Sequence, residues 1–433
     1  MYFPRHSWFH FQEHNMVLTS QQARTEAERC LQCFDAPCIQ ACPTHIDIPT
    51  FIAMIKSGNV RGAAEIVKTS NALANVCGKV CPEEIYCQSV CNRSKEDEPI
   101  QIRELHFFAT QYEARSGYNP LRSFPKKESR VAVLGGGPTG LGCAFELAKL
   151  GYKVTLFDGK GLGGIPKNSI PSFRLAGKEL QDDAKFLASQ FRVRRKNIAA
   201  SDLSTLRKKF DSVYVGIGLG KDRSLGVKGE RLEGVFPVLH FLEAAKKGKM
   251  STGNKVVVVG GGNVSLDAAA TAKRLGASEV TLIYRRSESE MKVWKGELEE
   301  ARKQGVEICF LTNPVAIVGK KNVSGVKCRR TVLSKKKDSS GRPVPVEVKG
   351  SDFTLKADTV VIAIGQVIGA DLIKHLKLND RGFIAVDKKF QTSVPGIFAG
   401  GDAISGEGTI VQSVAHGKQA AWAMHEYMER TIG

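Results

Sequence analysis

The 433-residue sequence has no run approaching the roughly 18 consecutive apolar residues that a membrane-spanning helix needs. Residues 1–20 lack the apolar segment of a secretory signal peptide, so we expect a cytoplasmic protein with no membrane partner. The formal net charge is +19, but the basic residues are scattered and lack the interleaved aromatic side chains that stack on bases. We therefore expect no nucleic acid, and we interpret the basic surface as suited to an acidic protein partner.

Cysteine is scarce in most of the chain, because eight of the eleven cysteines lie between Cys30 and Cys91. This density in a cytoplasmic protein indicates metal ligands and not disulfides. The two sets are Cys30-x2-Cys33-x4-Cys38-x3-Cys42-Pro43 and Cys77-x3-Cys81-Pro82-x4-Cys87-x3-Cys91. In two-cluster ferredoxins the cysteine before proline ligates the other cluster. The spacing therefore predicts two [4Fe–4S] clusters, with Cys30, Cys33 and Cys38 on one and Cys42 crossing over; zinc is the alternative.

A first glycine-rich unit spans 130–158 and has the strand, turn, helix and strand of half a Rossmann fold. Its G-x-G-x-x-G turn begins at Gly135, and such turns admit a pyrophosphate at the helix N-terminus. Asp158 ends the second strand, where an acid binds a ribose hydroxyl, and Gly164 follows shortly after. Farther along, Asp402 ends the segment 398–402 and is predicted to hold the ribityl or pyrophosphate part of a flavin. An ordinary strand-to-helix turn is the alternative there.

A second unit of the same kind spans 255–286. Its turn contains Gly260 and Gly262, but Ser265 replaces the third glycine. The second strand ends in Arg285 and Arg286 instead of an acid, and arginines at this place suit the 2′-phosphate of NADPH. The alternative is a solvated strand end that accepts NADPH or NADH.

The rest of the chain carries simpler signals of secondary structure. We expect helices over 20–36, 48–56 and 61–69, a linker at 116–129, hairpins around 320–355, and strands at 359–364 and 396–399. The predicted fold class is α/β, with a helical two-cluster iron–sulfur domain followed by two Rossmann-like nucleotide-binding domains.

Together these motifs resemble the family that contains the glutamate synthase small subunit and the N-terminal half of dihydropyrimidine dehydrogenase. The stretches that carry the resemblance are Cys30–Cys38, Cys42–Thr44, Cys77–Pro82, Ile170–Arg174, Gly216–Gly218, Ala363–Gly365 and Phe398–Asp402. Val215–Leu219 and Gln412–Trp422 are closer to the dihydropyrimidine dehydrogenase branch. The resemblance implies domains at 1–125 for the clusters, 126–235 and 367–433 for FAD, and 236–366 for NAD(P)H.

The resemblance also implies which residues hold the cofactors. The expected FAD contacts are Gly135, Gly136, Gly137, Pro138, Thr139, Asp158, Gly164, Ile165, Arg174, Asp402 and Thr409. The expected NADPH contacts are Gly261, Gly262, Asn263, Val264, Arg285, Arg286, Lys292, Ala363 and Gly365. One departure is the Pro166-Lys167 pair, which stands where the family has small polar residues.

The resemblance changes the ligand set of the clusters. It implies that Cys91 completes the first cluster, together with Cys30, Cys33 and Cys38. The second cluster takes Cys42, Cys81, Cys87 and a non-cysteine residue that follows a Pro-Ile-x-Ile stretch, which is His106 here. The alternative is that Cys77 completes the second cluster.

The family's chemistry implies a function. We expect hydride transfer from NADPH or NADH to FAD, followed by single electrons through the clusters, with no catalytic acid–base residue. The FMN-binding barrel that follows this half in the long dehydrogenases is not in the sequence. We therefore expect a separate substrate-reducing subunit, either an FMN barrel or an amidotransferase-type large subunit. A scaffold that no longer turns over is the non-enzymatic alternative.

Overall fold

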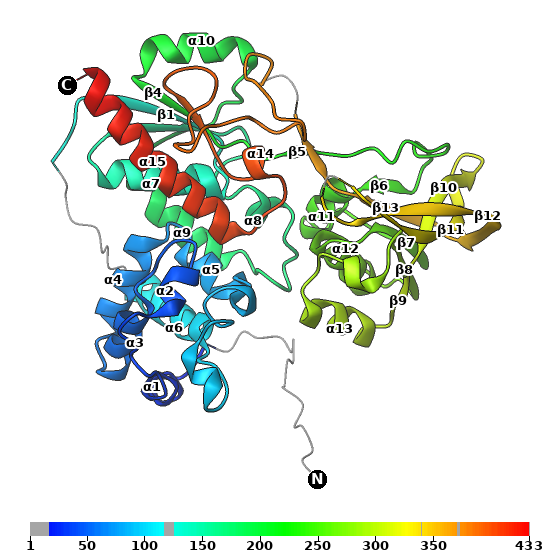
Figure 1. Cartoon of the computed structure of the whole chain (residues 1–433), viewed down its shortest axis with the longest axis horizontal. Coiled ribbons are helices and arrows are strands. Elements are labelled where there is room, and N and C mark those ends of the chain that lie inside the picture. Colours follow the sequence, from blue (N-terminus) through cyan, green and yellow to red (C-terminus); the bar gives the residue numbers. More distant parts are fainter. Residues whose placement is uncertain (1–16, 117–124, 339, 370–372, 433) are drawn as a thin grey trace. The chain divides into compact units, whose positions relative to one another are not determined.

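The computed structural model describes residues 17–116, 125–338, 340–369 and 373–432 (Figure 1). The chain divides into two compact units. The described residues of the larger unit lie within 15–167, 172–220 and 368–433, and those of the smaller unit lie within 168–171 and 221–367. The predicted domain boundaries stay a prediction. The centre of the predicted linker, 117–124, and the N-terminal residues 1–16 lie outside the described residues.

The larger unit begins with a helical region, as predicted. Its elements are α1 (Ser20–Glu28), α2 (Pro37–Ala41), α3 (Ile48–Lys56), α4 (Val60–Ser70), α5 (Ala74–Val80), η1 (Glu83–Ile85), η2 (Asn92–Lys95) and α6 (Ile102–Ser116). Phe51, Ile52 and Leu105 are fully buried and form the centre of its core. The Thr19 side chain starts α1 with a capping box.

Two of the three predicted helices in this region are confirmed, namely 48–56 and 61–69. The prediction of one helix over 20–36 is wrong beyond Glu28. Arg29 is the C-cap of the helix, and the left-handed backbone of Gln32, with a φ of 50°, is incompatible with a helix that continues through this position. Residues 29–36 form an irregular connection to α2 in place of the predicted helix.

The same unit contains a five-stranded parallel sheet with the order β15-β4-β1-β2-β3. Its strands are β1 (Arg130–Leu134), β2 (Lys153–Phe157), β3 (Arg192–Arg194), β4 (Ser212–Val215) and β15 (Ile397–Ala399). Its helices are α7 (Pro138–Lys149), α9 (Lys178–Ala188), α10 (Ala200–Lys209), α14 (Asp402–Ser405) and α15 (Ile410–Ile432); α8 (Ile165–Asn168) ends at the unit boundary. The C-terminal segment thus returns to the sheet that residue 130 begins.

The smaller unit repeats the parallel sheet, with the order β6-β13-β7-β8-β9. Its elements are β6 (Val235–Pro237), α11 (Val238–Lys246), β7 (Lys255–Gly260), α12 (Asn263–Arg274), β8 (Glu279–Ile283), η3 (Glu288–Glu290), α13 (Lys295–Lys303), β9 (Val306–Cys309) and β13 (Thr359–Ala363). An antiparallel sheet of β10 (Thr312–Gly319), β11 (Val323–Lys337) and β12 (Pro343–Lys356) confirms the predicted hairpins. The chain passes between the units at β5 (Gly220–Asp222) and β14 (Gln366–Ile368).

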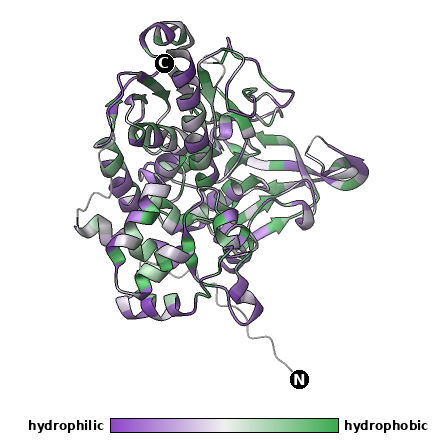
Figure 2. Cartoon of the chain, turned by 60° about the vertical axis from the view of Figure 1, so that its left-hand side comes forward, coloured by the Kyte–Doolittle hydropathy of each residue, from purple (hydrophilic) through white to green (hydrophobic). Residues whose placement is uncertain are grey.

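The strands at the centre of both parallel sheets are buried. Their residues are mostly apolar, as the hydropathy colouring of the chain shows (Figure 2). Strands covered on both faces need such continuous apolar runs, whereas β11 mixes buried and exposed positions and every residue of β12 is at least partly exposed. None of the helices in the described ranges has the length and apolarity that crossing a membrane demands.

Candidate functional site

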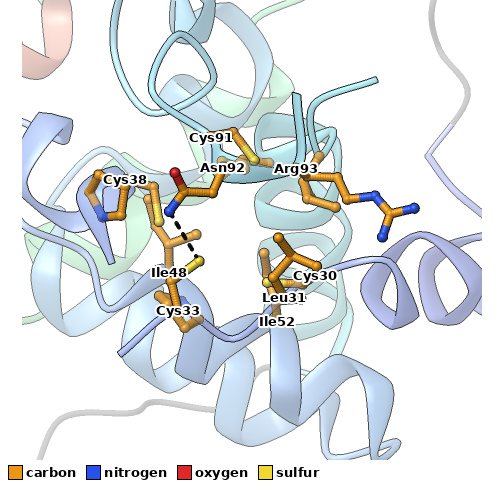
Figure 3. Close-up of a pocket in the computed structure, with 13 residues that line it drawn as sticks. Cys30, Leu31, Cys33, Cys38, Ile48, Ile52, Cys91, Asn92 and Arg93 are labelled. Carbon is orange, nitrogen blue, oxygen red and sulfur yellow. Dashed lines mark hydrogen bonds between the residues drawn. The ribbon is translucent and has the colours of Figure 1, made fainter. Parts of the chain in front are cut away.

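Four cysteines from two distant segments line one cavity in the helical region (Figure 3). They are Cys30, Cys33, Cys38 and Cys91. Ile48 and Ile52 of α3 contribute apolar lining, and Gln32, with its left-handed backbone, lies between the first two cysteines in the sequence. The structure therefore brings together the three cysteines that the spacing grouped and the fourth that the resemblance added. We call these four residues the first thiol group.

Burial and mutual repulsion oppose ionisation of the first thiol group. Burial, followed by the neighbouring charges of Cys30 and Cys91, raises the pKa of Cys38 to about 12. Burial also raises the pKa of Cys30, which the N–H donors of Gln32 counteract. Four thiolates at this spacing are stable only around a positively charged centre that offsets both costs. The donor set and its apolar lining fit a [4Fe–4S] cluster.

A second set of thiols surrounds Cys81. Burial raises the pKa of Cys81, and the charges of Cys77, Cys87 and Cys42 raise it further. Burial, followed by the charges of Glu83 and Cys42, raises the pKa of Cys87. Cys77 in α5 is fully buried, and burial raises its pKa to about 12. Cys81 and Cys42 thus each interact electrostatically with both Cys77 and Cys87.

His106, the predicted non-cysteine ligand, lies in α6 with only 7% of its surface exposed. Burial lowers its pKa to about 4, and its ring hydrogen-bonds the backbone of Ala74. Its Nε2 has no hydrogen-bond partner among the described residues. A ring held in this tautomer keeps a lone pair available, as ligating histidines do. Within the described part of the chain, however, the only charged group that shifts the pKa of His106 is Lys68. By contrast, Cys77 interacts electrostatically with two other thiols of this set, Cys42 and Cys81.

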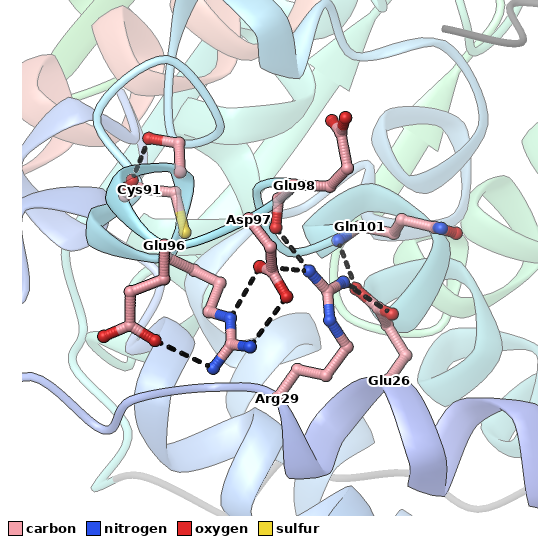
Figure 4. A network of polar contacts seen from close by, with 9 residues as sticks. Glu26, Arg29, Cys91, Glu96, Asp97, Glu98 and Gln101 are labelled. Carbon is pink, nitrogen blue, oxygen red and sulfur yellow. Dashed lines mark hydrogen bonds and ion pairs between the residues drawn. The ribbon is translucent and has the colours of Figure 1, made fainter. Parts of the chain in front are cut away.

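A charged network joins the two segments that carry the first thiol group (Figure 4). Asp97 accepts hydrogen bonds from Arg93 at 2.7 Å and from Arg29 at 2.9 Å. These arginines hold the pKa of Asp97 well below its ordinary value. Arg29 directly precedes Cys30, and Arg93 follows Cys91 by two positions. The network therefore fixes the two segments against each other. Within the described ranges, no three His, Cys, Asp or Glu side chains are close enough to hold a single metal ion.

The turn after β1 provides the three glycine positions of a dinucleotide site. A Cβ at Gly135 would lie 2.4 Å from the carbonyl oxygen of Gly216, and one at Gly140 would lie 1.9 Å from that of Gly135. A Cβ at Gly137 would meet no atom nearer than the Cα of Gly164, 3.9 Å away. The N-terminus of α7 is therefore open at Gly137, where a pyrophosphate can approach the backbone.

Asp158 organises the loop beside this turn. Its Oδ2 accepts the N–H of Gly136 at 2.7 Å, and its Oδ1 accepts the N–H groups of Lys160 and Gly161, both at 2.7 Å. The N–H of Gly163 donates to the carbonyl of Gly136 at 2.7 Å. The carboxylate thus stands at the edge of the open turn, where the sequence places a ribose.

The C-terminal segment adds two of the predicted flavin contacts, Asp402 and Thr409. A Cβ on Gly401 would lie 2.7 Å from Thr139, so Asp402 begins α14 close to the start of α7. Burial raises the pKa of Asp402 to about 6. Thr409 precedes α15, and its hydroxyl forms a 2.9 Å hydrogen bond with that of Tyr86 in the helical region.

The other predicted flavin contacts lie in the same unit. Pro138 is the first residue of α7, Ile165 begins α8 with an exposed side chain, and Arg174 is half-buried in the segment between α8 and α9. Pro166 does not disrupt the chain, because it occupies the first turn of α8, where no N–H is needed.

The turn after β7 is the counterpart in the smaller unit. A Cβ at Gly261 would lie 2.3 Å from the ring of Tyr284, whereas one at Gly262 would have nothing within 4 Å. Lys292 forms a β-bridge with Gly262. The side-chain oxygen of Asn263 accepts a 3.1 Å hydrogen bond from the backbone N–H of Trp294, two residues after Lys292. The structure therefore brings Gly261, Gly262, Asn263 and Lys292 together around an open helix N-terminus.

The third glycine of this turn is replaced without loss of packing. Ser265 is fully buried, and its hydroxyl donates to the carbonyl of Gly262 at 2.5 Å. A Cβ at Gly260 would lie 2.2 Å from the carbonyl oxygen of Ala363, which places the end of β13 directly beside the turn. Gly365 follows with a φ of 103°, and Val264 packs against the core from α12.

The two arginines after β8 have different surroundings. Arg286 is only 2% exposed, and its guanidinium donates to Asp338 at 2.5 Å and to the carbonyl of Pro343 at 2.9 Å. Arg285 is exposed, and partial desolvation and then the charges of Arg286 and Arg342 lower its pKa. The structure therefore leaves Arg285 exposed near two other arginines and commits Arg286 to internal contacts.

Sequence reasoning missed several polar residues of these sites. Asn92, which lines the cavity of the first thiol group, and Tyr86, which bonds Thr409, follow no motif. Arg342 lies far from Arg285 in the sequence, and the pairing of β12 with β11 brings its charge near Arg285. Asp183, which contacts the start of α5, carried no sequence signal either.

Comparisons with known proteins agree with this geometry. Residues 129–421 match the model of the pyridine nucleotide-disulphide oxidoreductase family. Residues 7–118 match the model described as dihydropyrimidine dehydrogenase domain II, 4Fe-4S cluster. The predicted cofactor classes, FAD, a nicotinamide nucleotide and [4Fe–4S], are thereby confirmed.

Curated relatives cover nearly the whole chain. The NAD-dependent dihydropyrimidine dehydrogenase subunit PreT of Escherichia coli is 34% identical over 95% of this chain and 96% of its own length. The glutamate synthase [NADPH] small chain of Escherichia coli is 33% identical over 94% of this chain and 92% of its own length. The NADP(+)-dependent formate dehydrogenase subunit beta of Moorella thermoacetica is 37% identical over 91% of this chain, which spans only 60% of that longer protein.

Solved structures confirm the predicted α/β fold. FprA of Mycobacterium tuberculosis, solved in complex with NADPH, has a TM-score of 0.63 at 19% identity and covers 71% of this chain and 86% of its own. Thioredoxin reductase of T. acidophilum has a TM-score of 0.54 at 24% identity and covers 70% of this chain and 99% of its own. Together with the family models and relatives, these findings show that the chain is an oxidoreductase subunit of the pyridine nucleotide-disulphide oxidoreductase family, with a [4Fe–4S] domain in its N-terminal part.

Proposed function

We propose that the chain is the electron-input subunit of a two-component reductase, taking hydride from NADPH or NADH and delivering single electrons to a partner. FAD accepts the hydride as two electrons and can release them one at a time, which a [4Fe–4S] cluster requires. The convergence of Cys91 with Cys30, Cys33 and Cys38 on one cavity carries the proposal, because it supports a one-electron centre in the same chain as the two nucleotide sites.

The protein's own residues bind and orient the two nucleotides. In the larger unit, the open helix N-terminus at Gly137 and the carboxylate of Asp158 are suited to the pyrophosphate and ribose of FAD. Asp402 and Thr409 are proposed to contact its other end. In the smaller unit, the open backbone at Gly262 receives the nicotinamide nucleotide.

The preferred nucleotide is proposed to be NADPH. Arg285 lies among the positive charges of Arg286 and Arg342, which suits a 2′-phosphate. Arg286 supports this site indirectly through Asp338. The names of the relatives include both nucleotides, so the preference rests on Arg285.

For the clusters, the proposal keeps the assignments made from the sequence. Cys30, Cys33, Cys38 and Cys91 hold the first cluster. Cys42, Cys81, Cys87 and His106 hold the second cluster, with Cys77 as the alternative to His106. The unpartnered Nε2 supports His106, and the electrostatic contacts of Cys42 and Cys81 support Cys77.

The proposed partner is the FMN-barrel subunit of a split dihydropyrimidine dehydrogenase. The near full-length match to the dehydrogenase subunit PreT supports it, and the match to the glutamate synthase small chain makes an amidotransferase-type large subunit the second candidate. Anaerobic addition of NADPH to the isolated chain should bleach the flavin. Affinity capture under anaerobic conditions, followed by assay with uracil or with glutamine and 2-oxoglutarate, separates the two partners. A flavin that stays oxidised with either nucleotide would contradict the proposed function.

A further inference from the structure

Asn92 is a polar side chain in the cavity of the first thiol group. Its Nδ2 lies 3.5 Å from the Sγ of Cys33 and donates a hydrogen bond to it (Figure 3). Asn92 directly follows Cys91 in the sequence. The residue next to one cysteine of the group therefore hydrogen-bonds a cysteine of the other segment.

Lys95 determines which way the Asn92 amide points. Its Nζ donates to the Oδ1 of Asn92 at 2.9 Å, and both residues lie in η2. An ammonium group has donors and no acceptor, so the amide oxygen must face Lys95 and the NH₂ group must face the sulfur of Cys33. The positive charge on the oxygen side also polarises the amide and makes its N–H a stronger donor.

We propose that Asn92, oriented and polarised by Lys95, raises the reduction potential of the first cluster by donating a hydrogen bond to the Cys33 thiolate. Hydrogen bonds to the sulfurs are one of the features that set the potential of an iron–sulfur centre. A donor stabilises the reduced form more than the oxidised form, because the reduced cluster carries one more negative charge. The inference rests on the proposed function, in which Cys33 is a ligand of this cluster.

A purely structural role for Asn92 is the competing explanation. The two segments are already joined by Arg29, Arg93 and Asp97, whose hydrogen bonds do not involve Asn92. Asn92 and Arg93 both line the cavity, but the guanidinium of Arg93 binds Asp97, whereas the amide of Asn92 points to the sulfur of Cys33 (Figure 3). The measurement that separates the two roles is therefore a potential and not a stability.

The test uses the full chain with its cofactors, in an anaerobic redox titration followed by EPR. Asn92→Leu removes the donor at similar volume, and Asn92→Asp replaces the donor with a negatively charged acceptor. Both should lower the midpoint potential of one cluster and leave the other unchanged, with the larger shift for Asn92→Asp. Cys33→Ser, which alters the same cluster, identifies the signal. An unshifted midpoint potential in both Asn92 variants with intact clusters overturns the inference.

Lys95→Met provides a second variant that leaves the cavity lining untouched. Because Lys95 is exposed, its removal should lower the same midpoint potential by a smaller amount, and the shift should shrink at high salt. Lys56→Met is the matched control, since it removes an exposed lysine from the end of α3 in the same helical region. If the Asn92 variants fail to assemble the cluster, equal potentials in Lys95→Met and Lys56→Met overturn the inference.

Failure of the inference and failure of the proposed function give different results. If the unmodified protein shows no EPR signal of a reduced [4Fe–4S] cluster and no iron, the proposed function itself is contradicted. If both clusters are present and reducible but the midpoint potential of the first cluster does not change in the Asn92 and Lys95 variants, only the role of these two residues is contradicted.

Discussion

Lys68 and Asp183 form an ion pair that is closed off from solvent, with the Nζ of Lys68 3.2 Å from the Oδ1 of Asp183 and side chains 1% and 0% exposed. Lys68 lies in α4 of the helical region, and Asp183 lies in α9, which belongs to the part of the larger unit that contains the parallel sheet. The pair therefore connects these two parts of the larger unit. Asp183 also accepts the backbone N–H groups of Asn75 and Val76 at 3.2 and 3.0 Å, at the start of the helix that carries Cys77.

Removing one partner of this pair should be strongly destabilising. Asp183→Ala leaves a buried lysine charge and three N–H donors without their acceptor, namely the backbone N–H groups of Asn75 and Val76 and the side-chain amide of Asn75. Breaking a buried pair in this way costs about 3–5 kcal/mol. The free energy of unfolding, measured with urea, should fall by that amount. The double variant Lys68→Met/Asp183→Ala should lose less than Asp183→Ala alone. Lys153→Ala, which breaks an exposed pair with Glu128, should change stability by less than about 1 kcal/mol.

A loss in Asp183→Ala no larger than in Lys153→Ala would contradict the role of the buried pair. Equal losses in Asp183→Ala and the double variant would show that the N–H groups, and not the lysine charge, determine the cost.

The sequence predicted those parts of the site that depend on local pattern. The strand–turn–helix units were predictable because the glycine turn at Gly135 and the acid at Asp158 belong to one continuous segment. The roles of the adjacent Arg285 and Arg286 could not be separated. What distinguishes them is Asp338, which lies 52 residues from Arg286 and reaches it only through the fold. The buried pair of Lys68 and Asp183, 115 positions apart, was unpredictable for the same reason.

Arg285 and Arg286 should affect nucleotide binding in different ways. Arg285→Ala removes the proposed phosphate contact, which is worth about 1.5–3 kcal/mol, and should raise the KM for NADPH on the order of tenfold or more with little change for NADH. Arg286→Ala should lower thermal stability, because it leaves Asp338 unpaired. Steady-state kinetics with both nucleotides and thermal unfolding measure these effects.

Arg302→Ala serves as the control for Arg285, because Arg302 is an exposed arginine of the smaller unit paired with Glu288. A change in the KM for NADPH as large in Arg302→Ala as in Arg285→Ala, or an equal effect of Arg285→Ala on both nucleotides, would contradict the phosphate contact.

Asp402 should make the stability of the flavin-free protein depend on pH. Burial raises its pKa from the ordinary 3.8 to about 6, and the Ser413 hydroxyl is its hydrogen-bond donor at 3.3 Å. The folded state therefore binds a proton more tightly than the unfolded state, and this contribution is complete below pH 3.8 and lost as the pH rises through about 6. At pH 8, Asp402→Asn should stabilise the flavin-free protein on the order of 2 kcal/mol, and the gain should shrink toward pH 5.

Urea unfolding of the flavin-free protein at pH 5 and pH 8 checks this prediction. The exposed Asp380→Asn is the control and should change stability by no more than about 0.5 kcal/mol. Equal stabilisation by Asp402→Asn at both pH values would show that its carboxyl does not titrate in this range. Weaker retention of FAD by Asp402→Asn would support the proposed flavin contact.

Single variants should show whether His106 or Cys77 is the fourth ligand of the second cluster. His106→Ala and Cys77→Ala each remove one candidate, and both side chains are buried, so fold loss must be separated from ligand loss. Iron content, EPR of the reduced clusters and the far-UV circular dichroism of each variant provide that separation. If His106 is the ligand, His106→Ala should lose one cluster signal, and His106→Cys should restore a cluster with a lower midpoint potential, because thiolate replaces a neutral donor.

Cys77→Ala is the matched comparison for the same cluster. With His106 as ligand, it should retain both EPR signals and the full iron content. If Cys77→Ala abolishes one signal while His106→Ala leaves both unchanged, the sequence-based assignment is wrong and the electrostatic contacts of Cys77 with Cys42 and Cys81 identify the ligand. The second cluster would then have four thiolates, and its midpoint potential should not respond to substitution of His106 by Ala.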